Sequence, residues 1–218
     1  MNEIVPTILT SEIEDFSRKI NSLRGVCPRV QIDIIDGKFA PAKTIDLSAI
    51  RDLIDLGDLK IDLHLMVEEP SGWISRCLEL VPDRIIAQME KMADPLGFVN
   101  EIIESGAQVG LALDLETPMK NYSEDIYLLA DIVVLLGVKA GMGGQGFNPV
   151  VLEKIKKMRK ILGDPPVGGG KIGVDGGLNG ENIKLCQKAG ANVFYVGTDF
   201  WQAENSEKRY NELLKLLD

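Results

Sequence analysis

Short apolar segments recur along the chain at intervals of roughly 20 to 35 residues, and each stops at glycine or at a polar residue. Such segments are typical of strands that are buried on both faces of a parallel sheet. We expect strands over residues 4–9, 30–35, 60–66, 84–88, 108–113, 132–136, 171–174 and 193–196. The intervening segments have helical spacing instead, as in Ile13, Phe16, Ile20 and Leu23, which fall on one helix face. A closing helix is expected over residues 207–217.

Eight units of strand followed by helix in 218 residues predict an α/β protein with a (β/α)8 or TIM barrel. A doubly wound open sheet is the alternative, although such sheets more often use fewer strands. The chain contains no linker-like tract, so we expect residues 1–218 to form one barrel domain. The loosest stretch, residues 165–170, is interpreted as the connection into the seventh strand.

The composition argues against several classes of partner. The formal net charge is -9 and the isoelectric point is near 4.8, so nucleic acid and anionic membranes would be repelled. No apolar stretch approaches the roughly 20 residues that cross a bilayer, and the three cysteines lie far apart. We therefore expect a cytoplasmic protein with reduced thiols. The sequence leaves the oligomeric state open, and a homo-oligomer formed through the outer helices is compatible with it.

Two aspartates and the single histidine of the chain stand at the ends of predicted strands. Asp33 belongs to the second strand, His64 belongs to the third, and Asp175 directly follows the seventh. The carboxyl ends of the strands meet at one mouth of a barrel, so these side chains are expected to lie together. A histidine between two carboxylates indicates a proton-transfer site or a metal site.

Glycine-rich segments follow the sixth, seventh and eighth predicted strands. In barrels of this kind, the loops after strands seven and eight commonly bind phosphate through backbone amides. Glycines also permit sharp turns for purely structural reasons, but three such segments on successive strand ends favour an anion pocket. The residues expected to form it are Gly143, Gly144, Gly176, Gly177, Gly197 and Thr198.

Several longer motifs resemble those of the ribulose-phosphate 3-epimerase family, over residues 6 to 200. They read PTILT from Pro6, DIIDGKFAP from Asp33, DLHLMVEEP from Asp62, GMGGQGF from Gly141 and VDGG from Val174. The motifs are long, occur in the same order and are correctly spaced, so the resemblance is specific.

The resemblance implies an isomerase of carbohydrate metabolism that converts D-ribulose 5-phosphate to D-xylulose 5-phosphate. It assigns Asp33 and Asp175 as the catalytic pair, one removing the C3 proton and the other returning a proton to the opposite face of a cis-enediolate. It also implies a divalent metal, usually zinc, held by both aspartates, by His64 and by a second histidine whose place is taken by Gln31. Thr7 and Met66 fall where the family contacts its substrate.

Gln31 is the main departure from the family pattern. Its amide oxygen is a hard, neutral ligand that suits Mg or Mn better than Zn. A histidine common on the fourth strand falls on Gln88, and Lys139-Ala140 replaces an Asn-Pro pair, so the phosphate end matches the family better than the chemical end. Three alternatives stay open: an epimerase of another sugar phosphate such as a hexulose phosphate, metal-free proton transfer, and a sugar-phosphate-binding barrel that has lost metal and catalysis.

Overall fold

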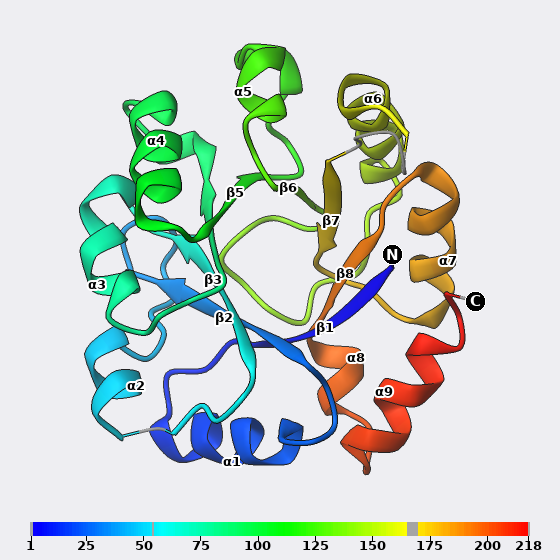
Figure 1. Ribbon diagram of the computed structural model, residues 1–218. Coiled ribbons are helices and arrows are strands. Elements are labelled where there is room, and N and C mark those ends of the chain that lie inside the picture. The colour runs from blue at the N-terminus through cyan, green and yellow to red at the C-terminus, as the bar shows by residue number, and fades with distance from the viewer. Residues whose placement is uncertain (1, 54, 165–169, 218) are drawn as a thin grey trace.

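The computed structural model describes residues 2–53, 55–164 and 170–217 of the chain. Eight parallel strands close into a barrel in sequence order, and β1 therefore pairs with both β2 and β8 (Figure 1). The strands are β1 (Glu3–Ile8), β2 (Arg29–Ile35), β3 (Lys60–Met66), β4 (Arg84–Gln88), β5 (Gln108–Leu113), β6 (Ile132–Leu136), β7 (Lys171–Asp175) and β8 (Val193–Val196). The expected (β/α)8 barrel is confirmed, and every predicted strand lies within one residue of its observed bounds.

Helices surround the barrel and connect the end of each strand to the start of the next (Figure 1). They are α1 (Ile13–Leu23), α2 (Leu47–Leu53), α3 (Ile74–Leu78), α4 (Pro95–Ser105), α5 (Glu124–Leu128), α6 (Val151–Leu162), α7 (Gly180–Ala189), α8 (Thr198–Trp201) and α9 (Ser206–Leu214), with short 3-10 turns at Pro70–Trp73, Met89–Lys91 and Met119–Asn121. The predicted closing helix corresponds to α9. The connection expected over residues 165–170 falls outside the described residues, except for Gly170. Within the described ranges, no helix is both long enough and apolar enough to span a membrane.

The apolar core has two parts, which follow from the alternation of side chains along each strand. The larger part lies between the strands and the helices, where Phe16 of α1 and Phe98 of α4 are fully buried. The smaller part fills the barrel interior and includes Val5, Ile86, Ile132, Val134, Val193 and Tyr195. Along each strand, the residues between those of the larger core part therefore point toward the barrel axis.

The strand register decides which polar side chains become neighbours inside the barrel. Along the β2–β3 pair, Gln31 is opposite Asp62 and Asp33 is opposite His64. Residues two apart share one face of a strand, so these four side chains project toward the barrel interior. The β2–β3 register thus places an acid and the histidine side by side.

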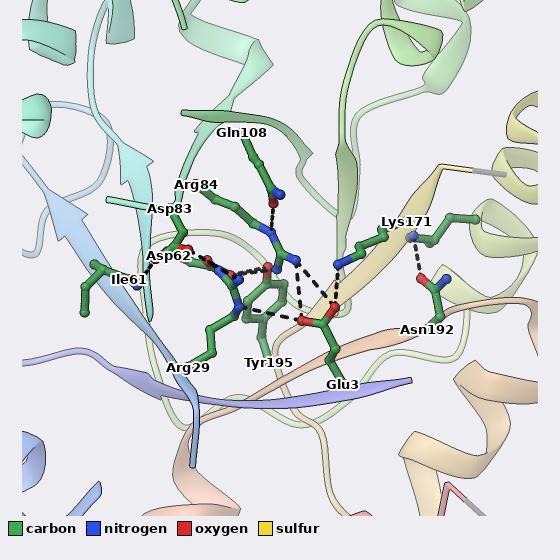
Figure 2. A network of polar contacts seen from close by, with 11 residues as sticks. Glu3, Arg29, Ile61, Asp62, Asp83, Arg84, Gln108, Lys171, Asn192 and Tyr195 are labelled. Atoms are coloured by element: carbon green, nitrogen blue, oxygen red, sulfur yellow. Dashed lines mark hydrogen bonds and ion pairs between the residues drawn. The ribbon is translucent and has the colours of Figure 1, made fainter. Parts of the chain in front are cut away.

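Charged side chains close the other end of the barrel, at the start of the strands (Figure 2). The fully buried Asp62 accepts hydrogen bonds from Arg29, from Arg84 Nη1 at 3.0 Å and from the hydroxyl of Tyr195 at 3.0 Å. Glu3 pairs with Arg84 at 3.4 Å and with Lys171 at 2.5 Å. Each buried charge thus has an opposite partner, as burial requires.

Candidate active site at the carboxyl ends of the strands

Asp33, His64 and Asp175 meet at the mouth of the barrel, as the sequence predicts. Nδ1 of His64 lies 3.1 Å from Oδ1 of Asp33 and 3.5 Å from Oδ2 of Asp175. The His64 side chain is 1% exposed and the carboxylates of Asp33 and Asp175 are 8% and 14% exposed, so solvent reaches the cluster only through the mouth. Two acids that are 142 residues apart in sequence are thereby joined through one imidazole.

Two glutamine amides complete this buried cluster. Gln31 Nε2 donates to Oδ1 of Asp33 at 3.0 Å and to Oδ2 of Asp175 at 2.7 Å, so the amide bridges the two acids. Gln88 Nε2 lies 3.2 Å from Nε2 of His64. The carbonyl oxygens of both amides are buried and have no hydrogen-bond partner among the described residues. In each amide, therefore, the nitrogen has a polar contact and the carbonyl oxygen has no hydrogen bond.

Burial and the neighbouring charges shift the pKa values of this cluster. Burial raises the pKa of Asp33 above its usual range, against the opposing hydrogen bond from His64, and the Asp175 carboxylate adds to the increase. Burial alone would lower the pKa of His64, but hydrogen bonds and charge attraction from Asp175 and Asp33 raise it to about 9. The two acids therefore favour the protonated form of the imidazole when no ion is bound.

Protonation of His64 bears on the orientation of Gln88. A protonated imidazole donates from both ring nitrogens, and its Nε2–H needs an acceptor. The amide of Gln88 supplies one when it is turned by 180°, because the two ends of an amide are nearly isosteric. In that orientation, the otherwise unpartnered Oε1 of Gln88 accepts from His64. Gln88 can thus satisfy either protonation state of the histidine.

A cavity of about 540 Å³ opens above the cluster. Every residue expected in the anion pocket lines it, as do the two residues expected to contact substrate: Thr7, Met66, Gly143, Gly144, Gly176, Gly177, Gly197 and Thr198. Asp33, His64 and Asp175 form part of the same wall, whereas Gln31 contributes only through its contacts with the two acids. The residues predicted for proton transfer and the residues predicted for phosphate binding therefore line the same cavity.

Two glycines are required by the close packing of the loops around this cavity. Gly177 has φ of 70°, and a Cβ there would lie 2.5 Å from the backbone nitrogen of Phe147. A Cβ at Gly197 would lie 2.9 Å from the hydroxyl oxygen of Thr7. Side chains at these positions would force apart the loops after β6 and β7, and the ends of β1 and β8, so bare backbone is needed here.

Sequence reasoning missed Lys19, which lines the cavity from α1. Its position in a helix with ordinary amphipathic spacing gives no motif that could have singled it out. Trp201, which follows the Gly197-Thr198 turn, also lines the cavity, and its indole nitrogen donates to the carbonyl of Thr7 at 2.6 Å. Lys139 borders the cavity from the loop after β6 and is exposed.

Asp33, His64 and Asp175 can together hold a divalent cation. One ligand atom from each residue lies within 4.8 Å of the other two, and an ion bound at roughly 2 Å separates its ligand atoms by about 3 to 4 Å. Two carboxylates and an imidazole are also donors that Zn, Mn and Mg accept. The donor set therefore fits a divalent metal. Gln31 lies close enough to both acids to influence which metal is preferred.

Comparison with known proteins agrees with this geometry. Residues 3–201 match the model of the ribulose-phosphate 3-epimerase family. The chain is 29% identical over 214 residues to the ribulose-phosphate 3-epimerase of Bacillus subtilis, covering 98% of each chain. It is 30% identical over 204 residues to the enzyme of that name from Mycobacterium leprae, covering 92% of this chain and 88% of the relative.

Solved structures share the fold at lower identity. A 3-hexulose-6-phosphate synthase superposes with a TM-score of 0.69 at 17% identity, covering 100% of both chains. Orotidine 5'-phosphate decarboxylase from Pyrococcus horikoshii superposes with a TM-score of 0.65 at 17% identity, covering 98% of each chain. These likenesses concern the barrel alone. The match along nearly the whole sequence goes further: the chain belongs to the ribulose-phosphate 3-epimerase family, whose members are isomerases.

Proposed function

We propose that this protein epimerises D-ribulose 5-phosphate to D-xylulose 5-phosphate at C3. The observation that carries the proposal is the junction of Asp33 and Asp175 at His64, on the wall of a cavity bordered by glycine loops. Inversion at carbon needs a proton acceptor on one face and a proton donor on the other. Two carboxyl groups on strands β2 and β7, which are not neighbours, can supply both.

Asp33 and Asp175 divide the proton transfer between them. The carboxylate facing the C3 hydrogen removes it and leaves a cis-enediolate, and the other carboxyl group protonates C3 from the opposite side. Met66 and Thr7 line the cavity beside the acids and orient the sugar.

A divalent ion held by Asp33, His64 and Asp175 would supply the positive charge that stabilises negative charge developing on the substrate oxygens. Gln31 Nε2 donates to both acids, and a 180° turn of the amide would present Oε1 to an ion held between them. A carbonyl oxygen there favours Mg or Mn over Zn. Gln31 is thus proposed as a weak fourth ligand.

The glycine segments after β6, β7 and β8 bind the substrate phosphate. Their backbone amides approach the cavity without side chains in the way, and the Thr198 hydroxyl adds a donor. The phosphate anchors C5 of the substrate, and the carbon chain of the pentulose then extends toward the two acids. The groups named are Gly143, Gly144, Gly176, Gly177, Gly197 and Thr198.

Asp175→Asn tests the assignment of the acids. We expect loss of turnover and of C3-proton exchange with deuterated solvent, measured by NMR, while the affinity for inorganic phosphate measured calorimetrically stays close to that of the wild type. Asp52→Asn, on the exposed face of α2, makes the same change of charge far from the cavity and should retain full exchange.

Full C3 exchange by Asp175→Asn would contradict the role of Asp175. A wild-type protein, loaded in turn with Zn, Mn and Mg, that binds phosphate but exchanges no C3 proton of ribulose 5-phosphate would contradict the activity itself. Turnover of a hexulose phosphate in preference to the pentulose would keep the chemistry and change the substrate.

A further inference from the structure

Lys19 is a cavity residue that comes from a helix rather than from a strand end or a loop. It belongs to α1, which lies outside the barrel and contacts α9 (Figure 1). Its side chain is only 14% exposed, and it lines the same cavity as Gly197 and Thr198. A mostly buried lysine that faces an anion pocket has a different environment from a solvated surface lysine.

Two contacts hold the ammonium group of Lys19 in place. Its Nζ lies 2.7 Å from Oδ2 of Asp15, one turn earlier in α1. It also lies 5.4 Å from the centre of the Trp201 ring, close enough for a cation–π interaction. Trp201 is itself fixed by its hydrogen bond to the carbonyl of Thr7. The charge is therefore positioned before any ligand arrives.

The charge around Lys19 is not cancelled by its neighbours. Asp15 is shared between Lys19 and Arg18, so these three residues carry a net charge of +1. Asp199, the acid of α8 that borders the cavity, is paired with Arg209 at 2.6 Å. The positive charge of Lys19 is thus available to a ligand.

A phosphate dianion would be stabilised by such a charge in this cavity. The glycine amides are neutral dipoles, which attract an anion less strongly than a full positive charge does. Among the described residues that line the cavity, the lysines are Lys19 and Lys139, and Lys139 is exposed to solvent. A partly buried ammonium is screened less and contributes more.

We propose that Lys19 is a binding residue for the phosphate dianion of the substrate, reaching the phosphate end of the cavity from α1. This inference rests on the proposed function and specifies how its phosphate is held. Lys19 sets affinity for the phosphorylated substrate and takes no part in the proton transfer, which occurs at Asp33 and Asp175.

Isothermal titration with inorganic phosphate at low salt tests this role without turnover. Lys19→Met keeps the aliphatic stem that packs beside Trp201 and should weaken phosphate binding by about tenfold. Lys19→Arg keeps the charge and should restore binding to within about threefold of the wild type. Lys156→Met is the matched control, because Lys156 also pairs with a carboxylate one turn earlier in its helix, Glu153, but is 55% exposed and does not line the cavity; it should change the phosphate affinity by less than about twofold.

A second measurement separates binding from chemistry. With ribulose 5-phosphate, Lys19→Met should raise KM by about tenfold and leave kcat nearly unchanged. Equal phosphate affinities for Lys19→Met and the wild type, equal losses for Lys19→Met and Lys156→Met, or no phosphate binding by the wild type would each overturn the inference. Lys19-dependent phosphate binding without epimerisation would overturn only the proposed function.

Discussion

Gln31 is the residue on which the proposed metal preference of the site depends. Its amide nitrogen bridges Asp33 and Asp175 where the family resemblance places a histidine. An amide can turn either a donor or an acceptor toward the acids, whereas an imidazole nitrogen offers a stronger bond to zinc. The site has therefore kept the two acids and His64 while changing the group that joins them.

Restoring the histidine should strengthen zinc binding. We expect Gln31→His to raise the zinc affinity on the order of tenfold or more, because an imidazole nitrogen replaces a weak amide oxygen. Competition with a chromogenic chelator measures this without reference to turnover. Gln187→His, which adds a histidine on α7 away from the mouth, should leave the affinity unchanged. An unchanged affinity in Gln31→His would place Gln31 outside the metal shell.

At the scale of single elements, the short helices are held by side chains at their ends. Asp46 directly precedes α2, and its Oδ1 accepts from the backbone nitrogen of Ser48 at 2.9 Å. Arg76 of α3 donates to both carboxylate oxygens of Asp46 at 2.9 Å. Hydrogen bonds from Ser48 and Arg76 lower the pKa of Asp46 to about 2. One carboxylate thus caps α2 and joins it to α3.

This cap predicts a pH-dependent contribution to stability. A lowered pKa means that the contribution is present above the unfolded value near 4 and is lost as the pH falls toward 2. We expect Asp46→Ala to lower the free energy of unfolding by about 1 kcal/mol at pH 7, as for other N-cap carboxylates. Urea unfolding from pH 7 to pH 3 should show the difference between variant and wild type shrinking as the pH falls. A difference that is constant or grows with acid would show that the charge of Asp46 is not responsible.

At the scale of the whole molecule, the two ends of the barrel have different roles. The mouth carries an incompletely satisfied polar cluster, with the unpartnered oxygens of Gln31 and Gln88. The opposite end carries a charge network in which Asp62 binds Arg29, Arg84 and Tyr195 (Figure 2). The first arrangement suits binding and chemistry, and the second suits a rigid closure of the strands.

Breaking this network should destabilise the protein without altering its chemistry. Asp62→Asn leaves the buried Arg84 without a full counter-charge, and we expect a loss of about 3 kcal/mol in the free energy of unfolding measured in urea. The kcat of the folded variant should stay within about twofold of the wild type, because the side chain of Asp62 bonds to Arg29, Arg84 and Tyr195 and not to the two acids or His64. Asp83→Asn, at the partly exposed rim of the network, should cost less than about 1 kcal/mol. Equal losses in the two variants would contradict the importance of burial.

The positions of the strands and the acids could be read from the chain because strand geometry is local. Apolar segments that stop at glycine or at a polar residue located all eight strands, and the shared mouth at the carboxyl ends of those strands indicated that Asp33, His64 and Asp175 would meet. The glycine segments after β6, β7 and β8 likewise came together because parallel strands end on one side of a barrel.

Other features were set only by tertiary packing. Lys19 reaches the cavity because α1 is oriented by its packing on the barrel, which sequence spacing does not specify. The bridge from Gln31 to both acids depends on the distance between β2 and β7, which is fixed when the barrel closes. The network around Asp62 joins residues from β1, β2, β3, β4, β7 and β8. Local periodicity determines the face on which a side chain lies, whereas contacts between distant segments depend on the closed barrel as a whole.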